Sequence, residues 1–122
     1  MKQQIEPLEY TISVEGKSIL VDQLGYLLDP SDWSDAVAKH IALNEDVELQ
    51  QDHWVMIKFV RDWFEDRNSV PEARWLLKAM KAELGELKAT RRYLHQLFPH
   101  GYGPELCKIA GMRMPRKVML DV

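Results

Sequence analysis

The sequence predicts a mostly α-helical protein of the α+β class. We expect a small helical bundle with helix-turn-helix-like elements, an N-terminal β-hairpin and a flexible C-terminal arm. Three observations lead to this prediction. Apolar residues recur at helical spacing through most of the chain, and strict polar–apolar alternation is confined to residues 9–14. The length of 122 residues suits one domain. We place that domain at residues 1–111 and the arm at residues 112–122.

The hairpin is predicted near the start of the chain. Residues 9–14 alternate polar with apolar or aromatic side chains, and residues 19–21 are apolar. Glu15, Gly16 and Lys17 lie between the two runs, and glycine supplies the positive φ that a tight turn needs. A two-stranded sheet is marginal alone, so we expect it to pack on the helices.

Two long helices should follow. Asp29, Pro30 and an acidic first turn predict a helix start near residue 30, and apolar residues at spacing four carry that helix to about Asn44. A second helix is predicted from about Gln50 to Arg67. Its apolar residues widen into a broad face, so we expect it to be the most buried helix.

Shorter helices fill the rest of the domain. Residues 69–72 resemble a capping box, and helical spacing from residue 73 to 84 predicts a third helix that Gly85 ends. Thr90 could cap a short helix that reaches Phe98, and the proline- and glycine-rich residues 99–104 break it. A last short helix, from about Pro104 to Ala110, holds Cys107.

Composition and charge limit the compartment and the kind of partner that we expect. A single cysteine excludes an internal disulfide and fits a reducing compartment, and there is no apolar run of signal-peptide or membrane-spanning length. We therefore expect a cytoplasmic protein. Residues 1–66 carry 5 basic and 14 acidic side chains, whereas residues 67–122 carry 11 and 5. The C-terminal half should favour acidic surfaces, although attraction between the halves explains the division more simply.

Few side chains suggest a catalytic, metal-binding or nucleic-acid-binding role. The four histidines form no metal-binding pair at spacing four, so we expect neither a metal site nor a cofactor. Cys107 could pair with His95 or His100 as nucleophile and base, but a lone cysteine more often behaves as a small buried apolar residue. Arg91 and Arg92 beside short helices permit a helix-turn-helix that binds nucleic acid. Against it, the pI is about 5.8 and there is no dense basic stripe.

Five segments, taken in order, resemble the DsrC/TusE family of sulfur-relay proteins. The segments are Gly25–Trp33 (GYLLDPSDW), Leu49–Trp54 (LQQDHW), Phe59–Phe64 (FVRDWF), Leu97–Pro99 (LFP) and Cys107–Gly111 (CKIAG). The resemblance extends from about Glu9 to Pro115. It implies a small helical fold with an N-terminal hairpin and a flexible C-terminal arm that carries sulfur on cysteine.

The resemblance also implies partners. DsrC members serve dissimilatory sulfite reductase, as its gamma subunit, and carry two cysteines on the arm. TusE members pass persulfide sulfur toward tRNA thiolation and need the penultimate cysteine. Members of this kind are protein substrates of other proteins rather than enzymes. We therefore expect a non-enzymatic sulfur carrier or interaction protein.

The arm of this chain departs from the family pattern. Alignment on Cys107 and Gly111 keeps Pro115 but puts Val118 where the family has its terminal cysteine. Cys107 thus matches the upstream cysteine, and the principal sulfur acceptor is missing. An intramolecular disulfide on the arm is chemically impossible.

These comparisons lead to one hypothesis with alternatives. We expect binding to sulfur-transfer or sulfite-reductase-type proteins through the arm, with a possible persulfide or mixed disulfide on Cys107. The expected partner-binding residues are Arg113, Pro115, Arg116 and Lys117. The alternatives are a regulatory family member without sulfur transfer and a DNA-binding protein that uses Arg91 and Arg92.

Overall fold

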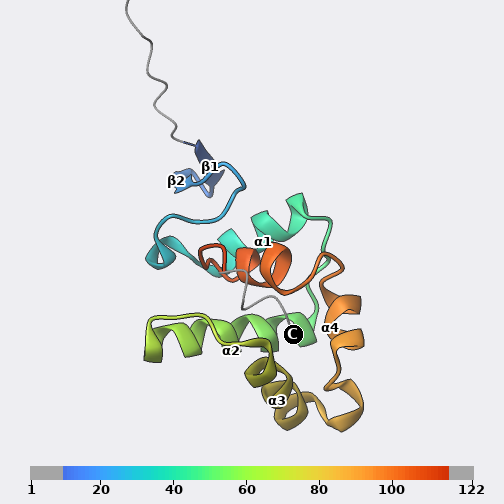
Figure 1. The fold of residues 1–122 in the computed structure, drawn as a ribbon. Coiled ribbons are helices and arrows are strands. Elements are labelled where there is room, and N and C mark those ends of the chain that lie inside the picture. Colours follow the sequence, from blue (N-terminus) through green and yellow to red (C-terminus); the bar gives the residue numbers. More distant parts are fainter. Residues whose placement is uncertain (1–9, 116–122) are drawn as a thin grey trace, which may run out of the picture.

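The computed structural model describes residues 10–115 and confirms a mostly helical fold with an N-terminal hairpin (Figure 1). Its elements are β1 (Tyr10–Val14), β2 (Lys17–Val21), η1 (Pro30–Asp32), α1 (Asp35–Asn44), α2 (Gln51–Arg67), α3 (Ala73–Leu84), η2 (Glu86–Lys88), α4 (Arg91–Leu97) and η3 (Tyr102–Cys107). The first two η elements are single 3₁₀ turns. The third is a π-helix that continues as helix through Lys108 and Ile109. Among the described residues, no helix is long and apolar enough to cross a membrane.

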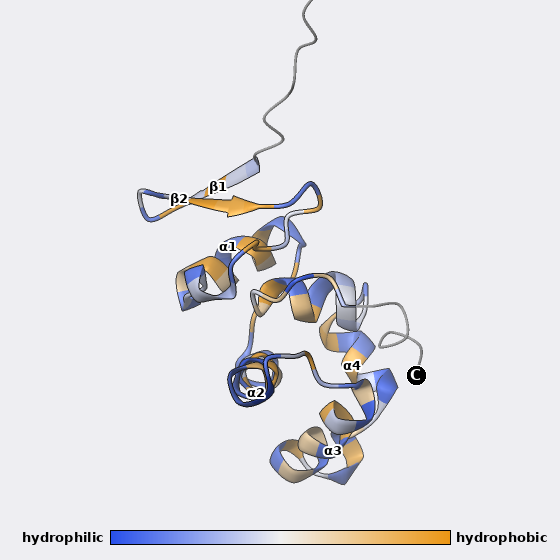
Figure 2. Cartoon of the chain, turned by 60° about the vertical axis from the view of Figure 1, so that its left-hand side comes forward, coloured by the Kyte–Doolittle hydropathy of each residue, from blue (hydrophilic) through white to orange (hydrophobic). Residues whose placement is uncertain are grey.

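The hairpin is antiparallel and closes through a two-residue loop. Val14 pairs with Lys17, and Glu15 and Gly16 between them have φ of 52° and 81°. Two successive positive φ values define a type I′ turn, whose twist matches that of the strands. Val14, Ile19 and Val21 are buried and join the main core, so the hairpin packs on the helices as expected. Figure 2 shows the apolar character of β2.

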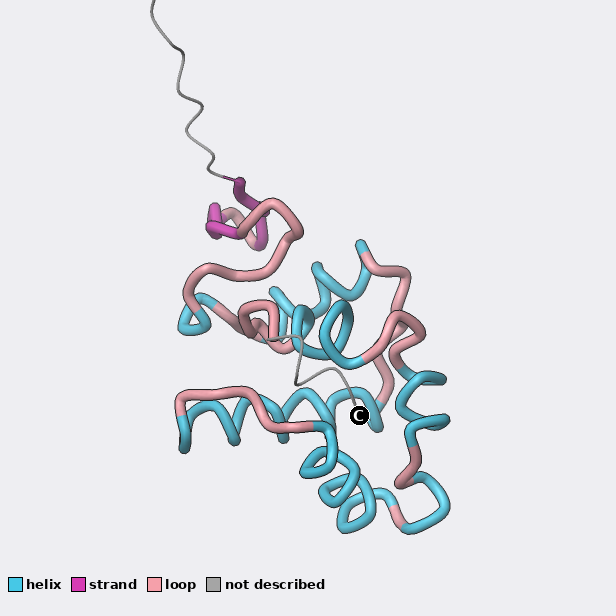
Figure 3. The backbone as a smooth tube through the Cα atoms, viewed as in Figure 1, coloured by secondary structure: helices cyan, strands magenta, loops and turns pink. Residues whose placement is uncertain are grey.

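The C-terminal helix is the middle layer of the bundle. Figures 1 and 3 show η3 between α1 and α2, with α3 on the far side of α2. Nearly every residue from Gly101 to Met112 is buried. The prediction that the helix over residues 50–67 would be the most buried is therefore wrong. Only four of the residues in α2 are buried.

The first predicted helix is split in two. A 3₁₀ turn over Pro30–Asp32 is followed by Trp33 in extended conformation, with φ of −73° and ψ of 149°. Helix α1 then begins at Asp35, and the Ser34 hydroxyl caps it by accepting the Val37 N–H at 3.2 Å. Trp33 thus lies before the helix instead of on its apolar face. The side chain is free to reach the C-terminal segment.

The next helices have the predicted bounds, but their caps differ. Residues 69–72 form no capping box, since Glu72 at the start of α3 makes no side-chain cap. The capping box lies at α2, where the Gln50 N–H donates to His53 Nδ1 at 3.0 Å. His53 Nε2 then donates to Leu97 O at 2.9 Å. One buried, neutral imidazole thereby fixes the start of α2 to the end of α4. Thr90 caps α4 as predicted.

His53 should make the stability of the fold pH-dependent. Burial lowers the pKa of His53 below its usual value, so the unfolded chain binds this proton more readily. The free energy of unfolding should therefore fall as pH drops below about 6.5, the ordinary histidine pKa. Urea unfolding at pH 7.5 and 5.5 should show a larger loss for the native chain than for His53→Gln. An equal loss in the two proteins would show that His53 is not the group responsible.

Candidate functional site

Cys107, the one cysteine of the chain, ends η3 and is completely buried. Burial raises the pKa of the Cys107 thiol well above its usual range, and a hydrogen bond with the Tyr102 hydroxyl offsets this only in part. Tyr102 is itself fixed, because its hydroxyl donates to Pro71 O. The thiolate is the reactive form of cysteine. In this conformation Cys107 is therefore neutral and unreactive.

The residues after Cys107 close the helix with a Schellman motif. The Met112 N–H donates to Cys107 O at 2.9 Å, and the Gly111 N–H donates to Lys108 O at 3.0 Å. Gly111 has φ of 80°, the left-handed conformation that this motif needs. Met112 is as completely buried as Cys107. The turn thereby fixes the base of the predicted arm to the protein body.

Two side chains from distant segments bind the remaining carbonyls of this helix end. The Trp33 indole Nε1 donates to Ile109 O at 2.8 Å, and Arg61 Nη1 donates to Ala110 O at 3.0 Å. Arg61 Nη2 also donates to Pro30 O at 3.2 Å, and its guanidinium lies 4.4 Å from the centre of the Trp33 ring. We call Trp33 and Arg61 the carbonyl clamp. It holds the C-terminal turn against η1 and α2.

Lys108 adds a polar contact on another side of the same turn. Its ammonium lies 2.8 Å from Glu45 Oε2 at the end of α1 and 5.1 Å from the centre of the Tyr26 ring. The Tyr26 hydroxyl donates to Gly103 O at 3.2 Å. Desolvation raises the pKa of Tyr26 to about 12, so this hydroxyl keeps its proton. Lys108 is thus engaged by Glu45 instead of being directed at the thiol.

One group of side chains has the composition of a metal site. Glu45, His100 and Glu105 each place a ligand atom within 4.8 Å of the others. These atoms already have partners, since His100 Nδ1 lies 2.7 Å from Glu105 Oε2 and Glu45 pairs with Lys108. Hydrogen bonding to Glu105 raises the pKa of His100. The arrangement is an ion-pair network around a buried carboxylate. His100 and His95 were the candidate bases for Cys107, and neither hydrogen-bonds to it.

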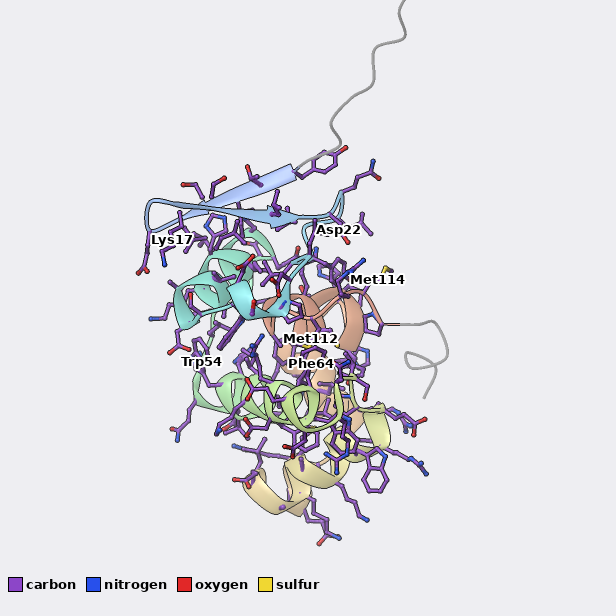
Figure 4. All side chains as sticks on the ribbon, turned by 90° about the vertical axis from the view of Figure 1, so that its left-hand side faces the viewer. Lys17, Asp22, Trp54, Phe64, Met112 and Met114 are labelled. Atoms are coloured by element: carbon purple, nitrogen blue, oxygen red, sulfur yellow. The ribbon has the colours of Figure 1, made fainter. Side chains whose placement is uncertain are left out.

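The expected partner-binding residues are described only in part. Arg113 and Met114 are exposed, whereas Pro115 is buried. They line a groove with Phe64 and Val70, next to Met112. Figure 4 shows Phe64, Met112 and Met114 on this side of the molecule. Arg116, Lys117 and Val118 lie outside the described residues, and the domain boundary at residue 111 stays a prediction.

The residues considered for nucleic-acid binding lie on α4. Arg91 and Arg92 are both exposed in its first turn. Residues 98–101 connect α4 to η3, which is the next helix along the chain. The second helix of a helix-turn-helix must enter the major groove. Helix η3 is the middle layer of the bundle, so it cannot do so.

Sequence reasoning missed the carbonyl clamp, although signals for it were present. Arg61 stood among the apolar residues of a predicted helix face, which is an unusual place for a cation. Trp33, Arg61 and Gly111 also belong to three of the five segments that carry the family resemblance. The ion pair between His100 and the buried Glu105 had no comparable signal.

The fold and the site together define a small helical protein with a thiol buried at the base of a C-terminal segment. The family described as "DsrC like protein" matches residues 13–119. Sulfurtransferase TusE of Salmonella choleraesuis is 46% identical over 103 residues, covering 84% of this chain and 94% of the relative. TusE of Escherichia coli K12 is 45% identical with the same coverage.

Solved structures agree with these matches. The oxidized gamma-subunit of the dissimilatory sulfite reductase (DsrC) from Archaeoglobus fulgidus superposes with a TM-score of 0.82 at 31% identity, covering 88% of this chain and 97% of that chain. The DsrC of Allochromatium vinosum superposes with a TM-score of 0.78 at 39% identity, covering 88% of this chain and 96% of that chain. The chain belongs to the DsrC/TusE family. Membership supports a role in sulfur relay.

Substitution of Gly111 should destabilise the fold more than substitution of an unhindered glycine. A Cβ on Gly111 would lie 2.5 Å from Trp33 Cδ1, whereas one on Gly16 would meet nothing within 4 Å. The φ values of the two glycines are nearly equal, so both variants incur the left-handed penalty of about 1–2 kcal/mol. Only Gly111→Ala should add an overpacking cost of about 1–3 kcal/mol. Urea unfolding measures the free energy of unfolding of the two variants. Equal losses of stability would contradict the close contact with Trp33.

Proposed function

We propose that this chain acts in sulfur relay by binding sulfur-transfer proteins through its C-terminal arm, and that Cys107 accepts sulfur only when the turn at residues 108–112 opens. The complete burial of Cys107 behind the carbonyl clamp carries the proposal. Family membership supports the pathway, and the buried thiol argues for control of its exposure. We place this activity in the cytoplasm.

The proposed chemistry is transfer of one sulfur atom from a persulfide. After opening, water solvates Cys107 and its thiol can ionise more readily. The thiolate attacks the terminal sulfur of the donor persulfide, and the sulfur–sulfur bond of the donor breaks as a new one forms on Cys107. The donor leaves as a thiolate and takes up the proton that Cys107 released. The electrons balance without an external oxidant or reductant.

The proposed partner contacts lie where the chain leaves the clamp. Arg113 and Met114 are exposed beside the apolar groove that Phe64 and Val70 line. A partner that presents an acidic and apolar surface there would contact the base of the arm directly, and the basic residues Arg116 and Lys117 would extend the contact. Binding of a sulfur-transfer or sulfite-reductase-type protein could then favour the open turn. Control of Cys107 would follow from docking.

Intact mass after incubation with glutathione persulfide tests the proposal. The native chain should gain one sulfur atom slowly, and Arg61→Gln should gain it faster. Loss of the Arg61 donor leaves a buried carbonyl unpaired, at about 1–3 kcal/mol, and each 1.4 kcal/mol of easier opening is about tenfold in the open population. We therefore expect an increase of roughly tenfold.

Two control variants make this result specific. Cys107→Ser should gain no sulfur. Arg67→Gln removes an exposed arginine from the same helix, where it lies over the Trp63 ring, and should react at the native rate. Equal rates for Arg61→Gln and the native chain would refute control by the clamp. No adduct in either protein, with urea-unfolded chain still alkylated, would refute sulfur acceptance and leave the regulatory alternative.

A further inference from the structure

A small cavity beside α4 has no role in the proposed sulfur chemistry. It lies where α4 meets the loop that leads into η3. Three of its lining side chains, Arg91, His95 and His100, are cations or can become cations. We propose that this cavity binds a tetrahedral oxyanion, such as phosphate or sulfate, through these three side chains.

The geometry leaves each of these side chains with a nitrogen that makes no other hydrogen bond. His95 Nδ1 donates to Arg91 O at 3.0 Å, so Nε2, on the side facing Gly101, can donate to an anion only when the imidazole is protonated. His100 uses Nδ1 for Glu105, which leaves its Nε2 uncommitted. Arg91 forms no ion pair with any other residue in the described part of the chain.

The charge-bearing side chains that line the cavity are all basic. The Glu105 carboxylate is almost completely buried behind His100, and its hydrogen bond raises the pKa of His100, so the imidazole holds its proton to higher pH. Glu105 does not line the cavity, nor does any other acidic side chain. The remaining lining includes Leu94 and Tyr102, whose apolar surface lowers the local dielectric and strengthens charge-assisted hydrogen bonds.

The size of the cavity limits the ligand. Its volume is about 190 Å³, below the range of about 300–1,000 Å³ that is typical of sites for drug-sized ligands. A single oxyanion or the terminal phosphoryl group of a larger molecule is of suitable size and charge. A bound nucleic acid would instead need a basic surface that includes Arg92. Arg92 does not line the cavity, although it is adjacent in sequence to Arg91.

The test is an NMR titration of the full chain with inorganic phosphate, inorganic sulfate or adenosine monophosphate. Chloride replaces each anion so that the ionic strength stays constant. We expect saturable shifts confined to residues 91–104 for both inorganic anions. A monophosphate that binds more tightly than free phosphate would identify the phosphoryl group of a larger ligand as the source. Equal affinities would identify the free anion.

Matched variants decide whether the cavity is the site. Arg91→Gln should weaken phosphate binding about tenfold or more, because it removes a charge-assisted contact, and His95→Gln should also weaken it. Arg92→Gln removes the same charge one residue away and should bind like the native chain. Equal weakening by the Arg91 and Arg92 variants, or shifts spread over all basic surfaces, would overturn the proposal. Unchanged spectra at saturating phosphate would overturn it as well.

Discussion

The end of the C-terminal helix imposes the constraint on which the rest of the site depends. This helix is buried between α1 and α2, so its last carbonyl groups cannot be solvated by bulk water and need partners within the protein. The Schellman turn satisfies two of them, and Trp33 and Arg61 satisfy two more. That requirement accounts for the interruption between η1 and α1, because Trp33 must leave the helical path to reach Ile109. It also accounts for an arginine on the inner side of α2.

The same packing determines the reactivity of Cys107. A thiol in the middle layer of a bundle is protected from reagents, and its ionised form is disfavoured by the loss of hydration. Cys107 therefore cannot undergo covalent sulfur chemistry while the structure is closed. The proposed acceptance of sulfur by Cys107 therefore requires a conformational change that exposes the thiol. We propose release of the clamp as the opening step, because it holds Ile109 and Ala110 close after Cys107.

Local sequence signals predicted the helices well and the site poorly. The bounds of α2 and α3, the Thr90 cap and the hairpin turn follow from periodicity and from residues close in sequence, and they agree with the structure. The errors concern contacts between distant residues. Helical spacing assigned Trp33 to the face of α1, but its partner lies 76 residues further along the chain. Burial of the lone Cys107 was the favoured expectation, but nothing in the sequence indicated that the short helix holding it would form the middle layer.

Hydrogen exchange tests the central claim that one opening event controls the thiol. The Met112 amide donates to Cys107 O across the turn, so its exchange reports whether the turn is closed. We predict that this amide and the alkylation of Cys107 give the same free energy of opening, and that it lies below the free energy of global unfolding. A Met112 amide that exchanges freely while Cys107 stays protected would contradict the account. So would a Cys107 that reacts with iodoacetamide as fast as an unfolded chain does.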